Sequence, residues 1–295
     1  MQILDGKLAS AAILESLKNE VLSSSAHFGR APQLCAIIAG NNPASESYLN
    51  SKTKACTATG IISSIVRLDA EVSENEFIQC IEKVNNDESI DGLLIQFPLP
   101  THFNESKIIN AIDPSKDVDG LHPVNAGKLA LGLPTFVPAT PLGIMLLLEH
   151  FNIETTGKHA VVIGRSNVIG RPISILLSRN EPFGNATATV CHSRTSNIKE
   201  LCLTGDIVVA ALGKPGFLTG DMIKEGAAII DVGINSVPDS SKKTGFAIKG
   251  DVDFESVAPK CNSISPVPGG VGLMTIAAIL QNTLLAYQNK FKFKS

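Results

Sequence analysis

The feature that most limits how this chain can fold is a regular alternation of strand and helix patterns. Short apolar runs alternate with segments of helical periodicity, which is typical of α/β proteins with mostly parallel sheets. The predicted strands span residues 33–39, 61–68, 92–96, 160–163, 187–191, 207–211 and 227–231. The predicted helices span residues 8–21, 43–59, 73–85, 141–151, 170–178 and 271–287, and the third opens with the capping box Ser73-Glu74-Asn75-Glu76.

The alternation is interrupted between Asp113 and Thr140, where the chain is rich in Asp, Gly and Pro. We predict a functional loop there that leads to a linker between domains. Two domains are expected because 295 residues exceed what one hydrophobic core usually supports. The prediction is two three-layer α/β domains, residues 1–140 with 275–295 and residues 141–274. The second is predicted to be Rossmann-like. The last helix is predicted to return to the first domain, because the second already has its strand–helix units.

Composition narrows the class of protein. Hydrophobic residues make up 44% and charged residues 18%, as in ordinary globular proteins, and the net charge is −3 without a basic run. Trp is absent and aromatic residues are 5%, so we expect no nucleic-acid partner. No apolar run reaches membrane-spanning length and the start lacks a secretory pattern, so we expect a soluble cytoplasmic protein without membrane partners. The six cysteines are scattered, which predicts reduced thiols and no metal site.

Tyr48 and Lys52 stand out on the predicted helix 43–59. At a spacing of four, both side chains project from one helix face. A phenol ring can stack on a flat heterocycle while an amine transfers a proton or activates water. The alternative is a solvated Lys beside a partly buried Tyr, and the spacing alone favours that alternative.

A candidate dinucleotide site follows the strand 160–163. The segment 164–172 joins that strand to a helix, where free backbone N–H groups favour an anion. Ser166 replaces the middle glycine of the usual motif, so a plain tight turn is an alternative. About twenty residues on, Ser193 and Arg194 stand where an NAD site would have an acidic residue. Together with Arg165 they favour the 2′-phosphate of NADP, against the alternative of an exposed Arg without a partner.

Seven segments taken together, in their order, resemble the bifunctional methylenetetrahydrofolate dehydrogenase/methenyltetrahydrofolate cyclohydrolase family. They are Pro43-Ala44-Ser45 with Tyr48 and Lys52, then residues 92–100, 116–120, 140–143, 164–166, 231–235 and 266–272. The chain departs from the family pattern at three positions. Ala139 stands where the family usually has Cys, Ser265 where it has Thr, and Leu273 where it has Pro. None of the three replaces a residue with a chemical role.

The resemblance implies two linked reactions. Methylenetetrahydrofolate gives a hydride to NADP+, and water then opens the methenyl cation to 10-formyltetrahydrofolate, within the one-carbon metabolism that serves purine and amino-acid biosynthesis. It also implies a homodimer, with folate in a cleft between the domains and NADP on the second.

The resemblance further assigns roles to single residues. It implies that Lys52 is the catalytic lysine, that Gln96 hydrogen-bonds it, that Asp119 binds the pterin edge and that Tyr48 stacks on folate. Further substrate-binding residues are Ile95, Phe97, Pro268, Gly269, Gly270, Val271 and Gly272. Cofactor-binding residues are Gly164, Arg165, Ser166, Ser193, Arg194 and Ile234.

These residue types suit that chemistry. Burial and a cationic substrate lower the pKa of a lysine, which makes a neutral amine available near pH 7. A carboxylate at Asp119 can accept paired hydrogen bonds from an amino-pyrimidinone edge. Without the resemblance, the sequence favours the alternatives that Asp119 is a turn residue and that Gln96 ends a strand without a contact.

The sequence pattern has three alternative functional interpretations. A short-chain dehydrogenase also uses Tyr-x-x-x-Lys, but there the pair follows the glycine-rich turn, whereas here it precedes Gly164 by more than a hundred residues. The other two are a dehydrogenase without cyclohydrolase activity and a non-catalytic NADP-binding sensor.

Overall fold

The computed structural model describes residues 1–242 and 245–292, and it divides into two compact units. The six-stranded unit contains Met1–Ser10 and Thr140–Thr275, and the three-stranded unit contains Ala11–Ala139 and Ile276–Ser295. The first ten residues therefore differ from the predicted division. They belong with the six-stranded unit because strand β1 (Gln2–Ile3) pairs in parallel with β11 (Ser263–Ile264).

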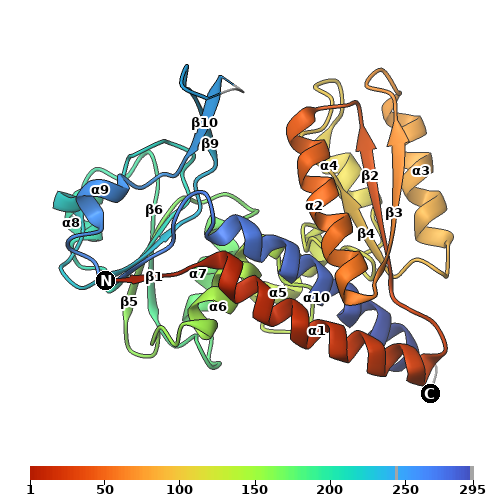
Figure 1. Cartoon of the computed structure of the whole chain (residues 1–295), viewed down its shortest axis with the longest axis horizontal. Coiled ribbons are helices and arrows are strands. Elements are labelled where there is room, and N and C mark those ends of the chain that lie inside the picture. Colours follow the sequence, from red (N-terminus) through yellow and green to blue (C-terminus); the bar gives the residue numbers. More distant parts are fainter. Residues whose placement is uncertain (243–244, 293–295) are drawn as a thin grey trace. The chain divides into compact units, whose positions relative to one another are not determined.

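The three-stranded unit is built on a parallel sheet in the order β3-β2-β4. Its strands are β2 (Gln33–Ala39), β3 (Ile62–Leu68) and β4 (Gly92–Ile95), with β2 in the centre. Figure 1 shows α2 (Pro43–Thr59) and α3 (Glu74–Asn86) beside these strands. Helices α3 and α4 (Glu105–Ala111) share a buried cluster with the strands: Cys35, Ile37, Phe77, Ile81, Val84, Ile90, Leu93, Ile95, Ile108 and Ile112. The helices of this unit thus stabilise the sheet whose strand ends carry the candidate site.

Local signals explain where its helices begin. Helix α3 starts with the predicted capping box, since the Ser73 hydroxyl accepts from the Glu76 N–H and the Glu76 carboxylate accepts from the Ser73 N–H. Helix α1 (Gly6–Phe28) is longer than predicted. The region 113–140, predicted as turns, contains helix α5 (Pro123–Ala130). This helix has Pro in its first turn, and the His122 ring caps it by accepting a hydrogen bond from the Val124 N–H. It thus forms from residues that are typical of loops.

The last helix, α10 (Val271–Lys292), returns to the three-stranded unit as predicted. The Asn282 side chain donates hydrogen bonds to the carbonyls of Val118 (2.8 Å) and Val137 (2.9 Å). The Tyr287 ring is fully buried, and its hydroxyl donates to the Arg30 carbonyl. By length and composition the segment Val271–Phe291 could also cross a membrane, contrary to the reading of the sequence, but 67% of it is buried in the fold, as in a core helix.

The six-stranded unit has a parallel sheet in the order β1-β11-β8-β7-β5-β6. Its remaining strands are β5 (His159–Ile163), β6 (Thr187–Cys191), β7 (Ile207–Ala210) and β8 (Ala228–Asp231). After β6 the chain crosses to the other side of β5, so the winding direction reverses between β5 and β7. Ligands of open α/β sheets bind at the carboxyl ends of strands at such a reversal.

Helices and a hairpin complete this unit. The helices are α6 (Ala139–His150), α7 (Gly170–Ser178), α8 (Ile198–Cys202) and α9 (Phe254–Val257), with a 3₁₀ turn at Gly220–Met222. An antiparallel hairpin, β9 (Asn235–Pro238) and β10 (Phe246–Lys249), extends from it (Figure 1). All seven predicted strands are present with ends shifted by at most one residue, whereas β1, β9, β10 and β11 were not predicted.

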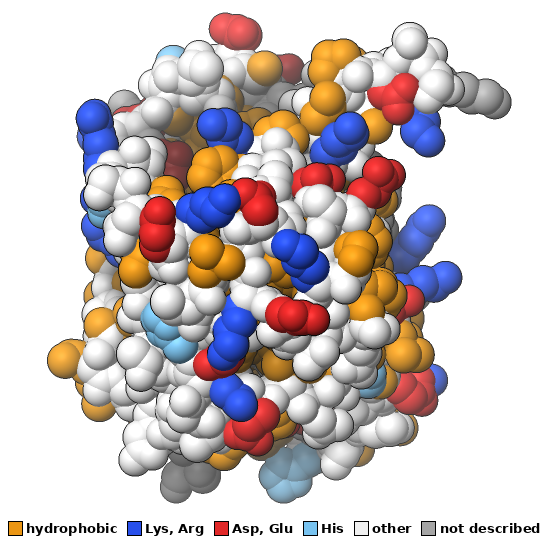
Figure 2. Space-filling view, turned by 90° about the vertical axis from the view of Figure 1, so that its left-hand side faces the viewer, with side chains coloured by type: hydrophobic (Ala, Val, Ile, Leu, Met, Phe, Trp, Pro, Cys, Tyr) orange, Lys and Arg blue, Asp and Glu red, His pale blue; other side chains and the backbone are white. Residues whose placement is uncertain are grey.

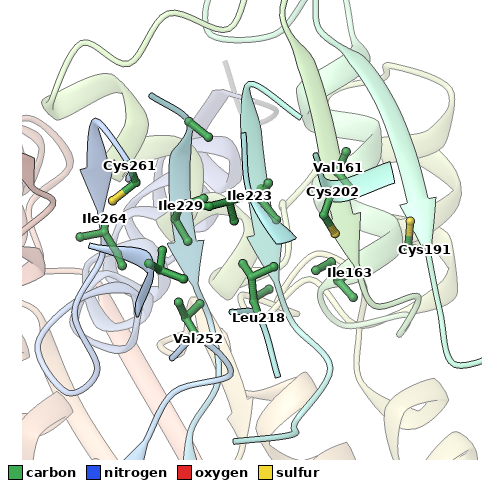
Figure 3. Close-up of a cluster of buried hydrophobic side chains, with 14 residues drawn as sticks. Val161, Ile163, Cys191, Cys202, Leu218, Ile223, Ile229, Val252, Cys261 and Ile264 are labelled. Carbon is green, nitrogen blue, oxygen red and sulfur yellow. The ribbon is translucent and has the colours of Figure 1, made fainter. Parts of the chain in front are cut away.

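One face of the sheet in the six-stranded unit packs on a large apolar cluster. Figure 3 shows Val161 and Ile163 from β5, Ile229 from β8 and Ile264 from β11 pointing into it. Three cysteines, Cys191, Cys202 and Cys261, pack there as small apolar side chains, and all six cysteines of the chain are free thiols.

On the face shown in Figure 2, basic and acidic side chains of the described residues are interspersed.

Candidate active site

Lys52 is a buried lysine on helix α2. Its side chain is 2% exposed, and among the described residues its amine has no hydrogen-bond partner. The amine lies 4.7 Å from the centroid of the Tyr48 ring, which confirms that the two side chains share one helix face. Burying an amine without a partner is costly, so such a group is more typical of a functional site than of a core.

Lys52 and Asp119 perturb each other's protonation. Burial lowers the pKa of Lys52 to about 8, although the nearby Asp119 carboxylate and Cys56 oppose this change. Burial raises the pKa of Asp119 to about 6, while Lys52 opposes that shift and Asp117 adds to it. Burial, and then Asp119, also raises the pKa of the Tyr48 phenol. A proton-accepting amine is therefore accessible near neutral pH, beside a carboxylate that is mostly ionised at pH 7.

The turn that carries Asp119 is closed by its neighbour Asp117. The Asp117 carboxylate accepts hydrogen bonds from the N–H groups of Leu121 (3.2 Å) and His122 (2.8 Å) and from the Asn125 amide (2.9 Å). Asp117 also forms a bridge to Leu93 at the sheet edge. The turn-forming role considered for Asp119 thus belongs to Asp117, which leaves the Asp119 carboxylate available to the site.

Gln96 follows the end of β4. Its backbone N–H donates to the Ile37 carbonyl (2.9 Å), and its side-chain amide donates to the Phe97 carbonyl (2.8 Å). The buried side-chain oxygen has no partner among the described residues, as is true of the Lys52 amine. The predicted hydrogen bond between Gln96 and Lys52 is not present in this structure. Lys52 and Gln96 thus carry two of the three buried polar atoms without a partner among the described residues, and the third is the Ser25 hydroxyl.

Two further predicted substrate residues adjoin Gln96. The Ile95 side chain is 4% exposed and belongs to the core cluster under α3 and α4, so its side chain has a packing role. Phe97 is half-buried against the same cluster, and its carbonyl accepts a hydrogen bond from the Ser45 hydroxyl (3.3 Å). That bond ties the start of α2 to the segment after β4, and the reading of the sequence gave Ser45 no such role.

The predicted cofactor turn has the geometry that a dinucleotide requires. Gly164 has φ of 139°, and a Cβ there would lie 2.2 Å from the Ala211 carbonyl oxygen, so only glycine fits. The Ser166 hydroxyl accepts from the N–H groups of Ile169 (3.1 Å) and Gly170 (3.3 Å). It thereby shapes the turn into α7, whose N-terminus lies at the winding reversal of the sheet. These features fit a pyrophosphate-binding turn.

The residues predicted to select NADP lie on the adjacent strand end. Strands β5 and β6 pair as far as Ile163 and Cys191, so the turns that follow them begin side by side. The turn after β6 is fixed because His192 N–H donates to the Thr195 hydroxyl (3.0 Å) and Arg194 N–H donates to the His192 ring (3.2 Å). The side chains of Ser193, Arg194 and Arg165 are exposed, as binding a phosphate from solvent requires.

The loop Pro268–Gly272, predicted to bind substrate, and Ile234, predicted to bind cofactor, belong to the six-stranded unit. Ile234 is 68% exposed, and its Cδ1 would lie 3.7 Å from a Cβ placed on Gly272. The Gly269 carbonyl accepts from the Gly6 N–H (2.9 Å), which anchors the loop.

The three departures from the family pattern are compatible with this structure. The Ser265 hydroxyl accepts from the Asp231 N–H (2.7 Å), an interaction that Thr would also provide. Leu273 is partly exposed and continues α10, and Ala139 is buried at the start of α6.

Cys56 is a site neighbour that the reading of the sequence missed. It is fully buried one turn after Lys52 on the same helix face, and its spacing of four from Lys52 is the signal that could have identified it. Among the described residues, no group of three His, Cys, Asp or Glu side chains is placed to hold a metal ion.

Comparison with known proteins identifies the family of this chain. The family profile "Tetrahydrofolate dehydrogenase/cyclohydrolase, catalytic domain" matches residues 4–119, and "Tetrahydrofolate dehydrogenase/cyclohydrolase, NAD(P)-binding domain" matches residues 138–291. The bifunctional protein FolD of Porphyromonas gingivalis is 52% identical over 295 residues, covering 99% of this chain and 98% of that protein.

Two solved structures are similar over nearly the full chain. The bifunctional FolD of Campylobacter jejuni is 44% identical with a TM-score of 0.91, covering 98% of this chain and 99% of that one. The Trypanosoma brucei methylenetetrahydrofolate dehydrogenase-cyclohydrolase, complexed with NADP cofactor and inhibitor, is 37% identical with a TM-score of 0.92 and covers 98% of both chains. This chain therefore belongs to the tetrahydrofolate dehydrogenase/cyclohydrolase family.

Proposed function

We propose that this chain oxidises 5,10-methylenetetrahydrofolate with NADP+ and then hydrolyses the resulting 5,10-methenyl cation to 10-formyltetrahydrofolate. Both enzyme activities and the cofactor NADP follow from family membership together with the two units described above. The observation that carries the catalytic assignment is the buried, unpartnered amine of Lys52, with its lowered pKa, beside Asp119.

In the oxidation, the protein binds and orients the reactants. NADP+, when bound, accepts the hydride that the methylene carbon of the folate loses. We assign the pyrophosphate to the Gly164–Ser166 turn and the N-terminus of α7, and the 2′-phosphate to Ser193, Arg194 and Arg165. The exposed Ile234 beside Gly272 provides an apolar contact for the cofactor. The loop Pro268–Gly272 is assigned to substrate.

In the hydrolysis, Lys52 transfers protons. A water molecule adds to the methenyl carbon while the neutral Lys52 amine takes its proton. The hydroxyl of this adduct then loses its proton to solvent as the bond from its carbon to N5 breaks; the carbon remains on N10 as a formyl group, and N5 receives a proton from the Lys52 ammonium. One water is consumed and one proton is released overall. The side-chain oxygen of Gln96, which is free of other partners, orients water or the lysine within this unit.

Asp119 and Tyr48 hold the folate. The Asp119 carboxylate, which is mostly ionised at pH 7, can accept two hydrogen bonds from the amino-pyrimidinone edge. Its charge also stabilises the methenyl cation. The Tyr48 ring already contacts the Lys52 amine on one helix face, so a folate ring stacked on it is brought to that amine.

A spectroscopic assay tests these roles. Purified protein receives 5,10-methylenetetrahydrofolate and NADP+, and NADPH, the methenyl intermediate and the 10-formyl product are followed separately. We expect all three from the wild type, while Lys52→Met loses hydrolysis by at least about a hundredfold, the lower range of general-base contributions. Lys54→Met is the matched control, because Lys54 is exposed on the same helix. NADPH formation without hydrolysis by the wild type would indicate a dehydrogenase alone, and NADP binding without turnover a sensor.

The assembly and location are further proposals. A homodimer is proposed from the family resemblance, and light scattering of the purified protein tests it. A cytoplasmic location, within the supply of one-carbon units for purine and amino-acid biosynthesis, is supported by the six free thiols. Tetrahydrofolate derivatives are the proposed partners, without nucleic acid or membrane. Fractionation of cells that express the chain tests the location.

A further inference from the structure

The buried carboxylate Asp251 fixes the turn after β7. Its side chain is 0% exposed. Its Oδ2 accepts hydrogen bonds from the N–H groups of Leu212 (2.7 Å) and Gly213 (2.8 Å), and its Oδ1 accepts from the N–H of Lys214 (2.8 Å). Three successive N–H groups thus converge on one carboxylate, and hydrogen bonds to an ionised acceptor are the stronger kind. The conformation of residues 212–214 therefore depends on Asp251.

The same carboxylate also fixes the segment after β8. The side-chain amide of Asn235 donates to Asp251 Oδ1 (2.8 Å) and to the Lys249 carbonyl (3.1 Å). Asn235 directly follows the exposed Ile234, which we assign to the cofactor. Asp251 therefore links two turns that leave neighbouring strands of the sheet.

A second buried carboxylate holds Asp251 in place. Asp231 ends β8, and its Oδ1 accepts from the N–H groups of Gly233 (2.9 Å) and Asp251 (2.8 Å), while its Oδ2 accepts from Val252 N–H (3.1 Å). A Cβ on Gly250 would lie 1.7 Å from Asp231 Oδ2, so the backbone before Asp251 approaches this carboxylate too closely for any side chain. The position of Asp251 is thus strongly constrained.

We propose that Asp251 is a positioning residue for the NADP-dependent oxidation, because it holds the turns after β7 and β8 in the shape that receives the cofactor. The inference rests on the proposed function. These turns lie at the carboxyl edge of the sheet, next to the reversal between β5 and β7 where such folds bind dinucleotides. Gly164 of the phosphate turn contacts Ala211, the residue before Leu212, so the turn after β7 adjoins the phosphate turn.

The substitution Asp251→Asn tests the proposal. It keeps the shape but places an amide donor against N–H groups that need an acceptor. We expect the dissociation constant for NADPH, measured by NADPH fluorescence, and the KM for NADP+ to rise about tenfold, the loss of one charge-assisted hydrogen bond. Hydrolysis of methenyltetrahydrofolate supplied directly, without NADP, should stay within about twofold of wild type. Asp253→Asn is the matched control two residues away and should change neither activity.

Several outcomes would overturn the proposal. They are an unchanged NADPH dissociation constant, or an equal loss of oxidation and hydrolysis, which would indicate a general folding role. If Asp251→Asn does not fold, Asn235→Ala removes one bond to the same carboxylate and should weaken NADPH binding severalfold. An unchanged dissociation constant in that variant would equally overturn the proposal. NADPH binding is measured directly and does not depend on turnover. A wild type that converts neither methylenetetrahydrofolate nor methenyltetrahydrofolate would disprove the proposed function, and the NADPH dissociation constants would still test the role of Asp251.

Discussion

At the scale of single residues, the site depends on a lysine whose side chain the fold buries. Lys52 lies on a helix whose face is buried, and the Asp119 charge, followed by Cys56, offsets only part of its desolvation. A fully compensated ion pair would keep the amine charged and useless as a base. Incomplete compensation leaves the pKa near 8, where protonated and neutral forms interconvert at physiological pH.

The first prediction concerns the pH dependence of hydrolysis. Since the neutral amine is the base, kcat/KM for methenyltetrahydrofolate should rise with pH and level off above about 8. Asp119 favours the charged amine, so Asp119→Asn should lower the Lys52 pKa and move the midpoint to lower pH, along with weaker folate binding. Rates corrected for uncatalysed hydrolysis give the profile, and Lys52→Met should lack this limb. An unmoved midpoint in Asp119→Asn would contradict the coupling.

The second prediction concerns cofactor choice. Arg194 is exposed on a turn that His192 and Thr195 hold rigid, so its substitution should not disturb the fold. Arg194→Ala should weaken NADP+ binding by about tenfold, the loss of one charge-assisted hydrogen bond, and leave NAD+ binding unchanged. Calorimetry with both nucleotides measures the difference, and NAD+ is the internal control. Equal weakening of both nucleotides would assign Arg194 to a shared part of the cofactor.

Residue-level prediction from sequence succeeded where spacing determines geometry. Tyr48 and Lys52 share a helix face because four residues make about one turn, and this requires no tertiary knowledge. The sequence did not identify Asp117 as the turn former, because two aspartates two residues apart are locally equivalent. Asp251 was missed because its four donors come from residues 212–214 and 235, distant in the chain.

At the scale of elements, strands such as β4, β5 and β7 were predicted well because each is a continuous apolar run that is almost entirely buried. Short elements were not predicted. Strands β1 and β11 have two residues each and exist only because they pair with one another and with β8. Helix α5 contains Pro123, Asn125 and Gly127, residues typical of loops, and its cap is a histidine ring. Tertiary contacts rather than local preference form these elements.

The third prediction concerns the start of the central strand. Arg30 makes a two-pronged ion pair with Asp91, whose side chain is 0% exposed, and so links the residue before β4 to the start of β2. Arg30→Gln leaves a buried carboxylate without its counter-charge and should lower the free energy of unfolding by about 3 kcal/mol. Lys18→Gln, which breaks an exposed pair with Glu15, is the control and should have no measurable effect. Urea titration followed by circular dichroism compares them.

At the scale of the whole molecule, each unit is completed by residues from distant parts of the chain. The six-stranded sheet ends with β1 from the N-terminus, and the three-stranded unit needs Asn282 and Tyr287 of α10. The return of the last helix was predicted by elimination, since the second domain already had its strand–helix units. The pairing of β1 in the six-stranded sheet was not predicted, because a strand of two residues shows no periodicity.

The fourth prediction tests that pairing. Leu4 is 0% exposed and its N–H donates to the Ile264 carbonyl (2.8 Å), whereas the neighbouring Ile3 is 38% exposed. Leu4→Ala should destabilise the protein by about 3 kcal/mol, and Ile3→Ala by less than about 0.5 kcal/mol. Chemical denaturation of both variants, with and without NADP+, measures the effect. An equal loss of stability in both variants would show that the burial of Leu4 is not what the first residues contribute to the fold.

The pairing of β1 with β11 also sets an order for synthesis on the ribosome. Gln2 and Ile3 are translated long before their partners Ser263 and Ile264. The nascent chain therefore carries an unpaired strand and an uncovered Leu4 until Ser263 and Ile264 have been made. Tyr287 follows Ile264 in the chain, so the three-stranded unit receives its buried ring only after β11 is made. A premature stop between Ile276 and Tyr287 would therefore truncate the three-stranded unit while the residues of the six-stranded unit, which end at Thr275, are already made.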